Sequence, residues 1–374
     1  MKVRLPRDGM KKSVVTLKTV AEHVGLTPGT VSAVLNNSPA SSSFPQHTKD
    51  RILAAARELN YRPNFFARSL RVKRTYTIGV ITEEVGDPYG GMIISGIEQY
   101  LRQRNFFFLT VAHRHDTKLL ETYSHLLLER GVEGFITIDT SVLEAPPLPT
   151  ISVAGHRQVK NVTNLVIDHR RAAEMALEHL KKLGHRDIAL MKGPSNSSDS
   201  EDRWKAIIEV CNQLGIPTNS KLMIRLRGDV VTPELGYVFV KKLLSSKLTF
   251  TALFAYNDSS AIGAIRAIKE LGLRVPEDIS VVGFDDIHSA AYSNPALTTV
   301  RQPLQKMGEI AARTLLNRIE NGELPAGDIV IEPELVVRSS TAPARITAQT
   351  DKVHDVESSR TDTEPGAKRQ LELP

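Results

Sequence analysis

The feature that most constrains the fold is a repeated change of hydrophobic period between residues 76 and 283. Short runs rich in β-branched and aromatic residues, which favour strands, alternate with longer stretches whose apolar residues recur at helical spacing. Strands are predicted over residues 77–81, 106–111, 135–138, 187–191, 222–226, 252–255 and 279–283. Helices are predicted over residues 91–104, 118–130, 201–214, 233–245 and 259–271. Such alternation predicts parallel, doubly wound sheets with helices on both faces, and the length suits two of them.

A different pattern precedes this region, where two short amphipathic helices are joined by a glycine. Thr16 is placed to cap the first helix and Gly25 to end it in the left-handed conformation. Thr27 and Pro28 suit the cap and first position of the second helix. A third helix is predicted over residues 48–60 and would close a small core. Its apolar stripe consists of Ile52, Leu53, Ala56 and Leu59.

The second helix leaves small residues on its outer face, so it could enter a DNA major groove. Two helices with a glycine turn also occur inside ordinary cores, and charge helps to separate the two interpretations. Residues 1–75 hold 14 Lys and Arg against 4 Asp and Glu, a net charge of +10. The whole chain is +6, so the remainder is −4. Positive charge confined to one small module favours contact with DNA phosphates.

Two further segments carry a family resemblance. With the helix pair, residues 58–64 (Glu-Leu-Asn-Tyr-Arg-Pro-Asn) and 67–70 (Ala-Arg-Ser-Leu) resemble the lactose-repressor (LacI/GalR) family of bacterial transcription regulators. The resemblance implies a homodimer on a pseudo-palindromic double-stranded operator, with a hinge leucine that wedges into the minor groove. The residues it assigns to DNA contact are Thr16, Thr27, Pro28, Gly29, Thr30, Ser32, Ala33, Asn36, Tyr61, Asn64, Ala67 and Leu70.

Departures from the family pattern leave the operator sequence open. Ala33 stands where members often carry Arg, which removes a bidentate guanine contact. The loop over residues 38–46 is about three residues longer than usual. Neither departure argues against DNA binding itself.

The same resemblance extends over almost all of residues 15–341. Its motifs are residues 183–186 (Leu-Gly-His-Arg), 193–194, 255–258, 276–286, 295–300 and 335–338. The implied fold is an N-terminal all-α helix-turn-helix domain followed by an α/β, two-lobed, periplasmic-binding-protein-like domain with three crossovers. In that fold residues 76–161 form the first lobe and 162–295 the second. The helix at 304–321 returns to the first lobe, and the final strands belong to the second.

Polar residues follow several predicted strands, where ligands bind in open α/β sheets. Carboxylates and amides can take paired hydroxyls, and Arg can bridge oxygens, so a sugar-like effector is expected. The candidate residues are Asp87, Tyr89, His156, Arg203, Asn257 and Asp285. Asp and Asn after strands can instead be helix caps, which is the preferred interpretation for Asp258. Ala206 and Val230 replace the family's usual glycine and aromatic residue, which leaves the class of ligand open.

These patterns predict five parts. They are a flexible basic arm (1–14), the helix-turn-helix domain (15–62), a hinge (63–75), the effector-binding and dimerisation domain (76–341) and a disordered tail (342–374). The helix at residues 91–104 is the expected dimer contact.

Composition excludes several other classes of protein. One cysteine excludes a disulfide framework and suits a reducing cytoplasm. The chain has no apolar run of membrane-spanning length and no export signal core. It has no phosphate loop, paired-His metal motif or nucleophile elbow, so no catalysis, metal or cofactor is expected. A sugar-binding transport protein is the alternative function, but it would need a signal sequence and would lack the basic module.

Overall fold

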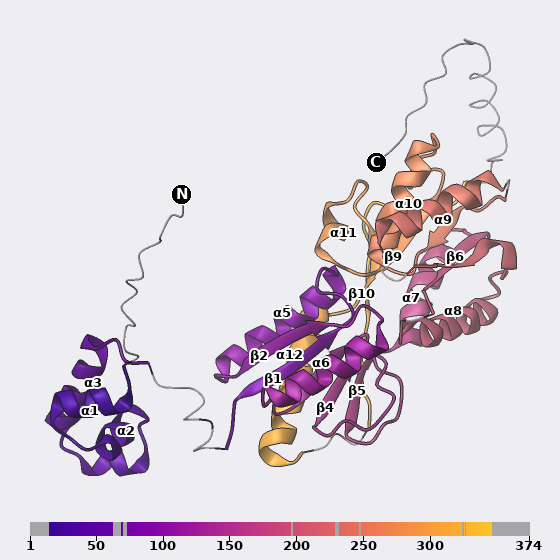
Figure 1. Ribbon diagram of the computed structural model, residues 1–374. Helices are drawn as coiled ribbons and strands as arrows, with labels where there is room; N and C mark the ends of the chain where they lie inside the picture. The colour runs from indigo at the N-terminus through magenta and orange to yellow at the C-terminus, as the bar shows by residue number, and fades with distance from the viewer. Residues whose placement is uncertain are drawn as a thin grey trace, which may run out of the picture. The chain divides into compact units, whose positions relative to one another are not determined.

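The computed structural model describes residues 15–62, 69, 73–195, 197–228, 232–246, 248–323, 325 and 327–345. The chain divides into two compact units, one ending at Thr75 and the other beginning at Tyr76 (Figure 1). The expected arm over residues 1–14, the hinge contacts Asn64, Ala67 and Leu70, and the tail after Arg345 lie outside the described residues.

The first unit is helical, as predicted. It contains α1 (Leu17–Val24), α2 (Pro28–Leu35), a 3₁₀ turn η1 (Pro39–Ser43) and α3 (Gln46–Glu58). Thr16 and Thr27 each accept a backbone hydrogen bond as N-caps, and Gly25 ends α1 with φ of +67°. Val20, Val31 and Ile52 are fully buried where the three helices meet. The caps therefore set the two turns, and one apolar side chain from each helix closes the core.

Two details of this unit differ from the prediction. Leu53 is 38 % exposed, and Ala55 is packed into the core in its place. The other predicted positions, Ile52, Ala56 and Leu59, do pack into this core, and α3 starts two residues earlier than predicted. The long loop before α3 contains η1, whose Ser41 is buried, so part of this loop packs onto the unit.

The second unit has two lobes, which we name lobe one and lobe two. Among the described residues, the sheet of lobe one has the order β11-β5-β4-β3-β1-β2, and all its pairs are parallel. Its strands are β1 (Thr77–Thr82), β2 (Phe107–Ala112), β3 (Phe135–Ile138), β4 (Thr150–Val153), β5 (Val162–Ile167) and β11 (Ile329–Ile331). Helices α5 (Pro88–Gln103) and α12 (Leu304–Asn321) cover one face, and α6 (Thr117–Glu129) covers the other.

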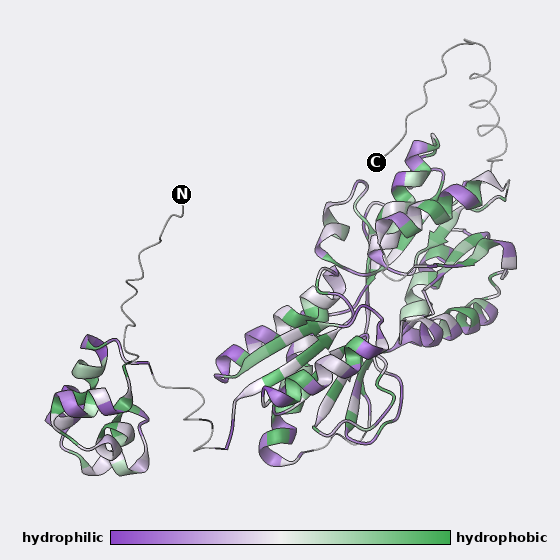
Figure 2. Cartoon of the chain, viewed as in Figure 1, coloured by the Kyte–Doolittle hydropathy of each residue, from purple (hydrophilic) through white to green (hydrophobic). Residues whose placement is uncertain are grey.

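The sheet of lobe two has the order β12-β10-β9-β8-β6-β7. Its strands are β6 (Ile188–Lys192), β7 (Met223–Arg225), β8 (Ala252–Phe254), β9 (Ser280–Asp285), β10 (Thr298–Arg301) and β12 (Glu334–Val336). Helices α7 (His169–Lys182) and α8 (Ser200–Leu214) cover one face, and α9 (Pro233–Ser245) and α10 (Asp258–Glu270) the other. The short elements η2 (Ser220–Leu222) and α11 (His288–Tyr292) precede β7 and β10. Figure 2 shows the apolar strands enclosed between helices that are polar outside.

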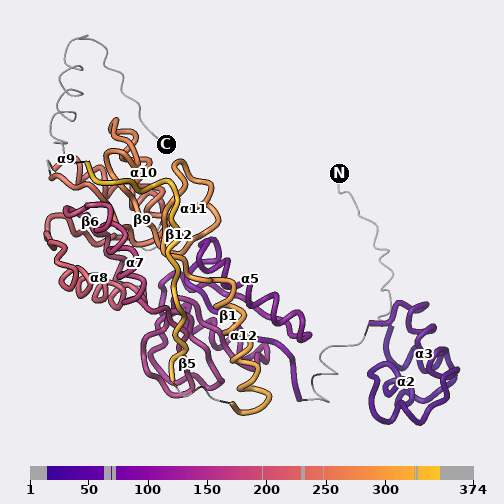
Figure 3. Tube along the Cα trace, turned by 180° about the vertical axis from the view of Figure 1, so that it is seen from behind, coloured from indigo at the N-terminus to yellow at the C-terminus, as the bar shows by residue number. Residues whose placement is uncertain are grey.

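The prediction of parallel sheets is correct except at one edge, where β12 runs antiparallel to β10. The chain crosses between the lobes after β5, after β10 and after β11. Figure 3 shows the last crossing from behind, where the yellow segment leads from the lobe of α12 to that of β12. Two lobe assignments are therefore wrong, because β5 and β11 both belong to lobe one. A three-residue strand such as β11 has no sequence feature that selects one sheet over the other.

The ordered chain extends past the predicted boundary at residue 341. The backbone N–H of Ala344 donates to Leu183 O at 2.7 Å, and a ring nitrogen of His185 lies 3.0 Å from Ala342 O. The predicted tail thus begins at least four residues too early. Within the described part of the chain, no helix combines the length and apolar character needed to cross a membrane.

Candidate effector and DNA-binding sites

A cavity of about 60 Å³ lies where the carboxyl ends of strands from both lobes meet. Strands β1 and β3 of lobe one and β6, β8 and β9 of lobe two lead into it. This is the position at which open α/β sheets bind ligands. The lining residues are Thr82, Glu83, Glu84, Asp87, Tyr89, Gly90, Ile138, Asp139, Pro194, Ser197, Asp199, Arg203, Tyr256, Asn257 and Asp285.

Arg203 is the central side chain of the lobe-two wall. Its guanidinium donates to Tyr256 O at 2.8 Å and is ion-paired with Asp199. It also stacks on Phe284, with its central carbon 3.8 Å from the ring centroid. Within the described residues, its buried Nε has no hydrogen-bond partner. The group is therefore held rigidly, with one donor left for a ligand.

Asp285 and Asn257 complete the lobe-two wall. Asp285 ends β9 with φ of +109°, is 4 % exposed and accepts a hydrogen bond from Gln302 Nε2 at 2.8 Å. Burial raises the pKa of Asp285 well above its usual range, although Arg203 acts in the opposite direction. Asn257 lines the cavity and also caps α10. The cap interpretation of Asp258 is therefore wrong, since its carboxylate instead accepts bonds from Thr299 Oγ1 and the backbone N–H of Ile287.

The lobe-one wall consists largely of carboxylates. Asp87 caps α5 by accepting from the backbone N–H of Gly90 at 3.2 Å, and burial raises its pKa. Burial also raises the pKa of Glu83 to about 9, and the carboxylates of Asp139 and Asp87 act in the same direction. Glu83 is ion-paired with His115. The buried hydroxyl of Tyr89 has no partner among the described residues. This wall therefore has an excess of acceptors.

Asp139 connects the two lobes. It follows β3 of lobe one and accepts hydrogen bonds from Ser197 Oγ at 3.2 Å and from the backbone N–H and Oγ of Ser198 at 3.0 and 2.8 Å. Both serines lie in the loop after β6 of lobe two. The same Ser198 hydroxyl lies 2.5 Å from Ala154 O of lobe one, so Asp139 and Ala154 O share its one proton. These bonds join the two lobes directly beside the cavity.

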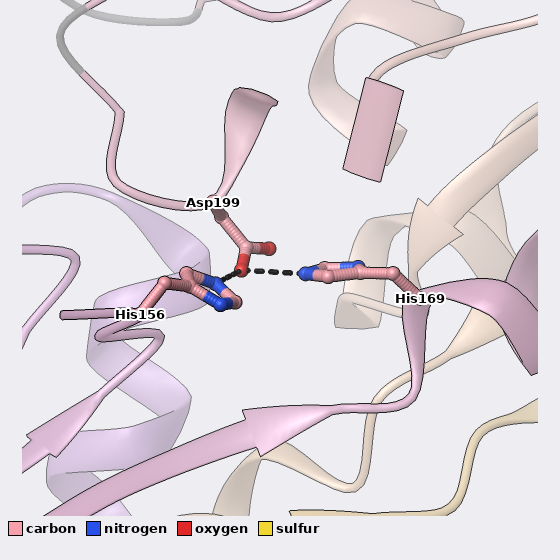
Figure 4. Close-up of side chains that lie close together, drawn as sticks. All are labelled: His156, His169 and Asp199. Carbon is pink, nitrogen blue, oxygen red and sulfur yellow. Dashed lines mark hydrogen bonds and ion pairs between the residues drawn. The ribbon is translucent and has the colours of Figure 1, made fainter. Parts of the chain in front are cut away.

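His156 does not line this cavity, which corrects its assignment as an effector contact. A histidine pair encloses Asp199, with His156 Nε2 and His169 Nε2 at 2.7 and 2.8 Å from Asp199 Oδ1 (Figure 4). Burial alone would raise the pKa of Asp199, but His169 and Arg203 hold it well below its usual range. Burial acts to lower the pKa of His156, and Asp199 outweighs it and raises that pKa. His156 thus reaches the effector cavity only through Asp199.

The helical unit presents the predicted DNA-contact residues of α2 at its surface. Thr27, Pro28, Gly29 and Asn36 are exposed, whereas Thr30, Ser32 and Ala33 are half-buried. The side chain of Asn36 folds back to donate to Ser32 O at 2.7 Å. The outer face of α2 is thus narrow and polar, as entry into a major groove requires.

Comparison with known proteins identifies the family. Residues 16–64 match the family model of bacterial regulatory proteins of the lacI family, and residues 177–341 match the periplasmic binding protein-like domain. The HTH-type transcriptional repressor PurR of Photorhabdus laumondii is 32 % identical over 336 residues, which cover 87 % of this chain and 97 % of that protein. The chain belongs to the lacI family. It is a ligand-responsive, DNA-binding transcriptional repressor.

Solved structures support the fold of this LacI-family repressor. The lac repressor dimer bound to operator and the anti-inducer ONPF matches with a TM-score of 0.78 and 28 % identity, over 88 % of this chain and 99 % of that one. A LacI family regulator from Enterococcus faecium with bound ribose matches with a TM-score of 0.64 and 29 % identity, over 72 % and 100 %. The predicted family and two-lobed architecture are thus confirmed.

Five of the six predicted effector residues of this repressor line the cavity, His156 being the exception. The prediction missed Glu83 and Asp139, although Asp139 directly follows a predicted strand, Glu83 comes two residues after another, and the same rule could have found both. It also missed Asp199 and His169, for which the sequence offers no comparable signal. Their partnership depends on how three segments from two lobes converge.

Proposed function

We propose that this repressor is a homodimer on a pseudo-palindromic DNA operator, and that a neutral, hydroxyl-rich, sugar-like molecule bound between its lobes sets its operator affinity. The first unit supplies the DNA contacts through α2. The second unit supplies the effector site. The orientation of the lobes connects the effector site with the DNA contacts. A ligand that binds one lobe orientation more tightly shifts the population toward it.

The charge of the cavity wall carries the proposal for the effector. Six carboxylates line the cavity, and Arg203 is the one basic side chain among its lining residues. A phosphate or carboxylate ligand would place a further negative charge beside acidic groups whose ionised forms burial already disfavours, so an anion is poorly matched to this site. Hydroxyl groups can donate to these carboxylates, and the free Arg203 Nε can donate to a ring or hydroxyl oxygen. The bound ribose of the Enterococcus faecium regulator supports the same class of ligand.

The size of the cavity supports a link between binding and lobe orientation. A cavity of about 60 Å³ holds only a few water molecules, and a sugar needs more room. The walls must therefore separate to admit the effector and close again on it. The hydrogen bonds of Asp139 to Ser197 and Ser198 are the contacts that this movement breaks and remakes.

A second copy of the chain is proposed to pack on lobe one, along α5 and the edge strand β2. Phe107 of β2 is 67 % exposed, and the other residues of this edge strand are also partly exposed. Met92, Ile94 and Tyr100 of α5 are only partly buried. A second lobe one would cover these apolar side chains, and the similar lac repressor binds its operator as a dimer. Leu70 is proposed as the minor-groove wedge of each hinge.

The test combines DNA selection with a ligand panel. The full chain is used to select its site from random duplexes, and the expected product is a pseudo-palindrome. Binding to the selected duplex is then measured with ribose, glucose, galactose, cellobiose, nucleosides, glucuronate and glucose 6-phosphate. We expect at least one neutral sugar to change operator affinity about 10-fold or more, within the usual range of coupling.

Asp285→Ala is the matched variant in this test, since its side chain lines the cavity of the second unit. It should select the same DNA site and lose the response to the sugar. Responses confined to glucuronate and glucose 6-phosphate would contradict the proposed class of effector. A selected site without two-fold symmetry would contradict the homodimer.

A further inference from the structure

Behind the effector cavity, three side chains from separate segments converge on one point (Figure 4). His156 lies in the loop between β4 and β5, His169 is the first residue of α7, and Asp199 is the N-cap of α8. The two Nε2 atoms and a carboxylate oxygen all lie within 4.8 Å of one another. The side chains of His169 and Asp199 are 8 % and 5 % exposed, and that of His156 is 17 % exposed. Such a buried, convergent set of donor atoms is not needed to bind a sugar.

We propose that His156, His169 and Asp199 bind a divalent first-row transition metal ion, in a site distinct from the effector cavity. Two imidazole nitrogens and one carboxylate oxygen form a ligand set suited to Zn²⁺, Fe²⁺ or Ni²⁺. Mg²⁺ and Ca²⁺ prefer oxygen ligands, so this set disfavours them. The sequence gives no paired-histidine motif because the three ligands are 13 and 30 residues apart.

The ligand atoms are close enough to converge on one ion once the side chains rotate. Each Nε2 is 2.7 or 2.8 Å from Asp199 Oδ1, which is a hydrogen-bond distance, and all three atoms lie within 4.8 Å of one another. A tetrahedral ion about 2.0–2.1 Å from each ligand requires ligand atoms about 3.3 Å apart. Binding therefore requires each Nε2 to move away from Oδ1 and the two imidazoles to turn toward a common centre. The ion would then replace the two Nε2 protons that now join the groups.

Neighbouring groups orient two of the ligands, as partners outside a metal's ligand shell commonly do. His156 Nδ1 lies 3.6 Å from Asp202 Oδ2, so a carboxylate faces the far side of that ring. The other oxygen of Asp199 is ion-paired with Arg203. This leaves Oδ1 directed at the two histidines.

The proposed site also has an access route. A second cavity of about 300 Å³ borders His156 and is lined by Ser152, Ser198 and Asp202. It can admit the ion and supply water molecules for the coordination positions that the protein leaves open. The effector cavity lies on the other side of Asp199, so the two ligands would not compete for space.

An ion here would tie the lobes together. His156 belongs to lobe one, whereas His169 and Asp199 belong to lobe two. By holding Asp199, the ion would also fix Arg203 in the effector wall. Metal binding would therefore favour the closed lobes and raise effector affinity, a consequence that rests on the proposed function. The metal site itself does not.

The test measures metal binding by the tag-free full chain after treatment with a chelator. Titration with Zn²⁺ is followed by calorimetry, and titration with Co²⁺ by its visible absorption, which reports coordination geometry. We expect one equivalent of tight binding. His169→Gln and Asp199→Asn should each weaken Zn²⁺ binding by about 100-fold or more, at least as much as loss of an outer-shell partner. His125→Gln, on the exposed surface of α6, is the matched control and should bind as the unaltered chain does.

Two results would overturn the proposal. One is binding by the unaltered chain that is no tighter than binding by His169→Gln. The other is tight binding that also disappears in His125→Gln. Asp199→Asn could fail to fold because Arg203 loses its partner, so His156→Gln provides a third variant, with circular dichroism as the check on folding. No DNA or effector is present in this experiment, so a failure to bind metal would leave the proposed function unaffected. Likewise, failure of the DNA and sugar experiments would leave the metal site unaffected.

Discussion

The two walls of the effector cavity differ in how their charges are arranged. On the lobe-two wall, the Asp199 carboxylate and the Arg203 guanidinium neutralise one another, and Gln302 supports Asp285. On the lobe-one wall, Glu83, Asp87 and Asp139 lie close together, and burial raises the pKa of each. Burial also raises the pKa of Asp285 on the lobe-two wall, but that wall holds the guanidinium of Arg203, whereas the lobe-one residues that line the cavity include no basic side chain.

This difference suggests that the two walls have different roles in effector binding. A preorganised wall loses little entropy on binding, so lobe two is suited to select the ligand. A wall of poorly compensated carboxylates gains most when donors approach it, so lobe one is suited to respond to closure. The comparison can be tested by altering one wall at a time.

The largest expected effect comes from breaking the rigid wall with Arg203→Ala. The change removes the donor that faces the cavity and leaves buried Asp199 and Asp285 without their guanidinium neighbour. Hydrogen bonds to charged groups contribute about 1.5–3 kcal/mol each, so effector affinity should fall about 100-fold. The affinity of the variant is measured by calorimetry with the sugar from the panel that has the largest effect on operator binding. Arg203→Lys should not restore affinity, because Lys lacks the planar fork; recovery with Lys would show that charge alone matters.

A smaller effect is expected from uncoupling the walls with Asp139→Ala. The variant loses the acceptor for Ser197 and Ser198, so the closed lobes become less populated and effector affinity should fall about 10-fold, equivalent to about 1.4 kcal/mol. Small-angle scattering should report a more open second unit. Asp139→Asn is the matched control, since it keeps one acceptor oxygen and should lose less. Equal losses would indicate that charge, not the bridge, is responsible.

The smallest effect on effector affinity is expected from relieving the lobe-one wall with Glu83→Gln, whose main effect is on stability. A carboxyl whose folded pKa, about 9, exceeds its ordinary value of 4.5 stabilises the fold less as pH rises between those values. The variant should therefore match the unaltered chain near pH 5 and melt at a clearly higher temperature near pH 9, because each unit of pKa difference corresponds to about 1.4 kcal/mol. Thermal unfolding across this range measures the effect, with exposed Glu129→Gln as the control. A gap that does not widen with pH would contradict the raised pKa.

Local rules predicted much of the site because it was built from local features. Arg203, Asn257 and Asp285 follow strands whose hydrophobic runs are plain in the sequence, and strand ends of parallel sheets meet at one edge. The same rule wrongly placed His156 in contact with the ligand. The rule assigns a residue to the correct edge of the sheet, but it does not say whether the side chain reaches the cavity. His169 lies beyond its reach altogether, since it begins a helix that follows a crossover between lobes.

The same limit applies to the fold. Strands β11 and β12 are each three residues long and only two residues apart, yet they belong to different sheets. Periodicity cannot assign such short strands to a sheet, because the choice depends on which edge has space for another strand. Ala55 and Leu53 show the problem on a smaller scale, because the larger apolar side chain was assigned to the core and the smaller one is buried there.

The crossovers also set an order of events during synthesis. Lobe one lacks α12 and β11 until residue 331 has left the ribosome, whereas the helices of the first unit are complete by residue 58. Proteins generally fold from the N-terminus during synthesis, so the DNA-reading helices of a nascent chain can form long before the lobes that regulate them. A chain cut short before residue 304 would keep α2 but lack a finished sheet to hold the effector. Only a chain translated to full length can therefore be regulated by the effector.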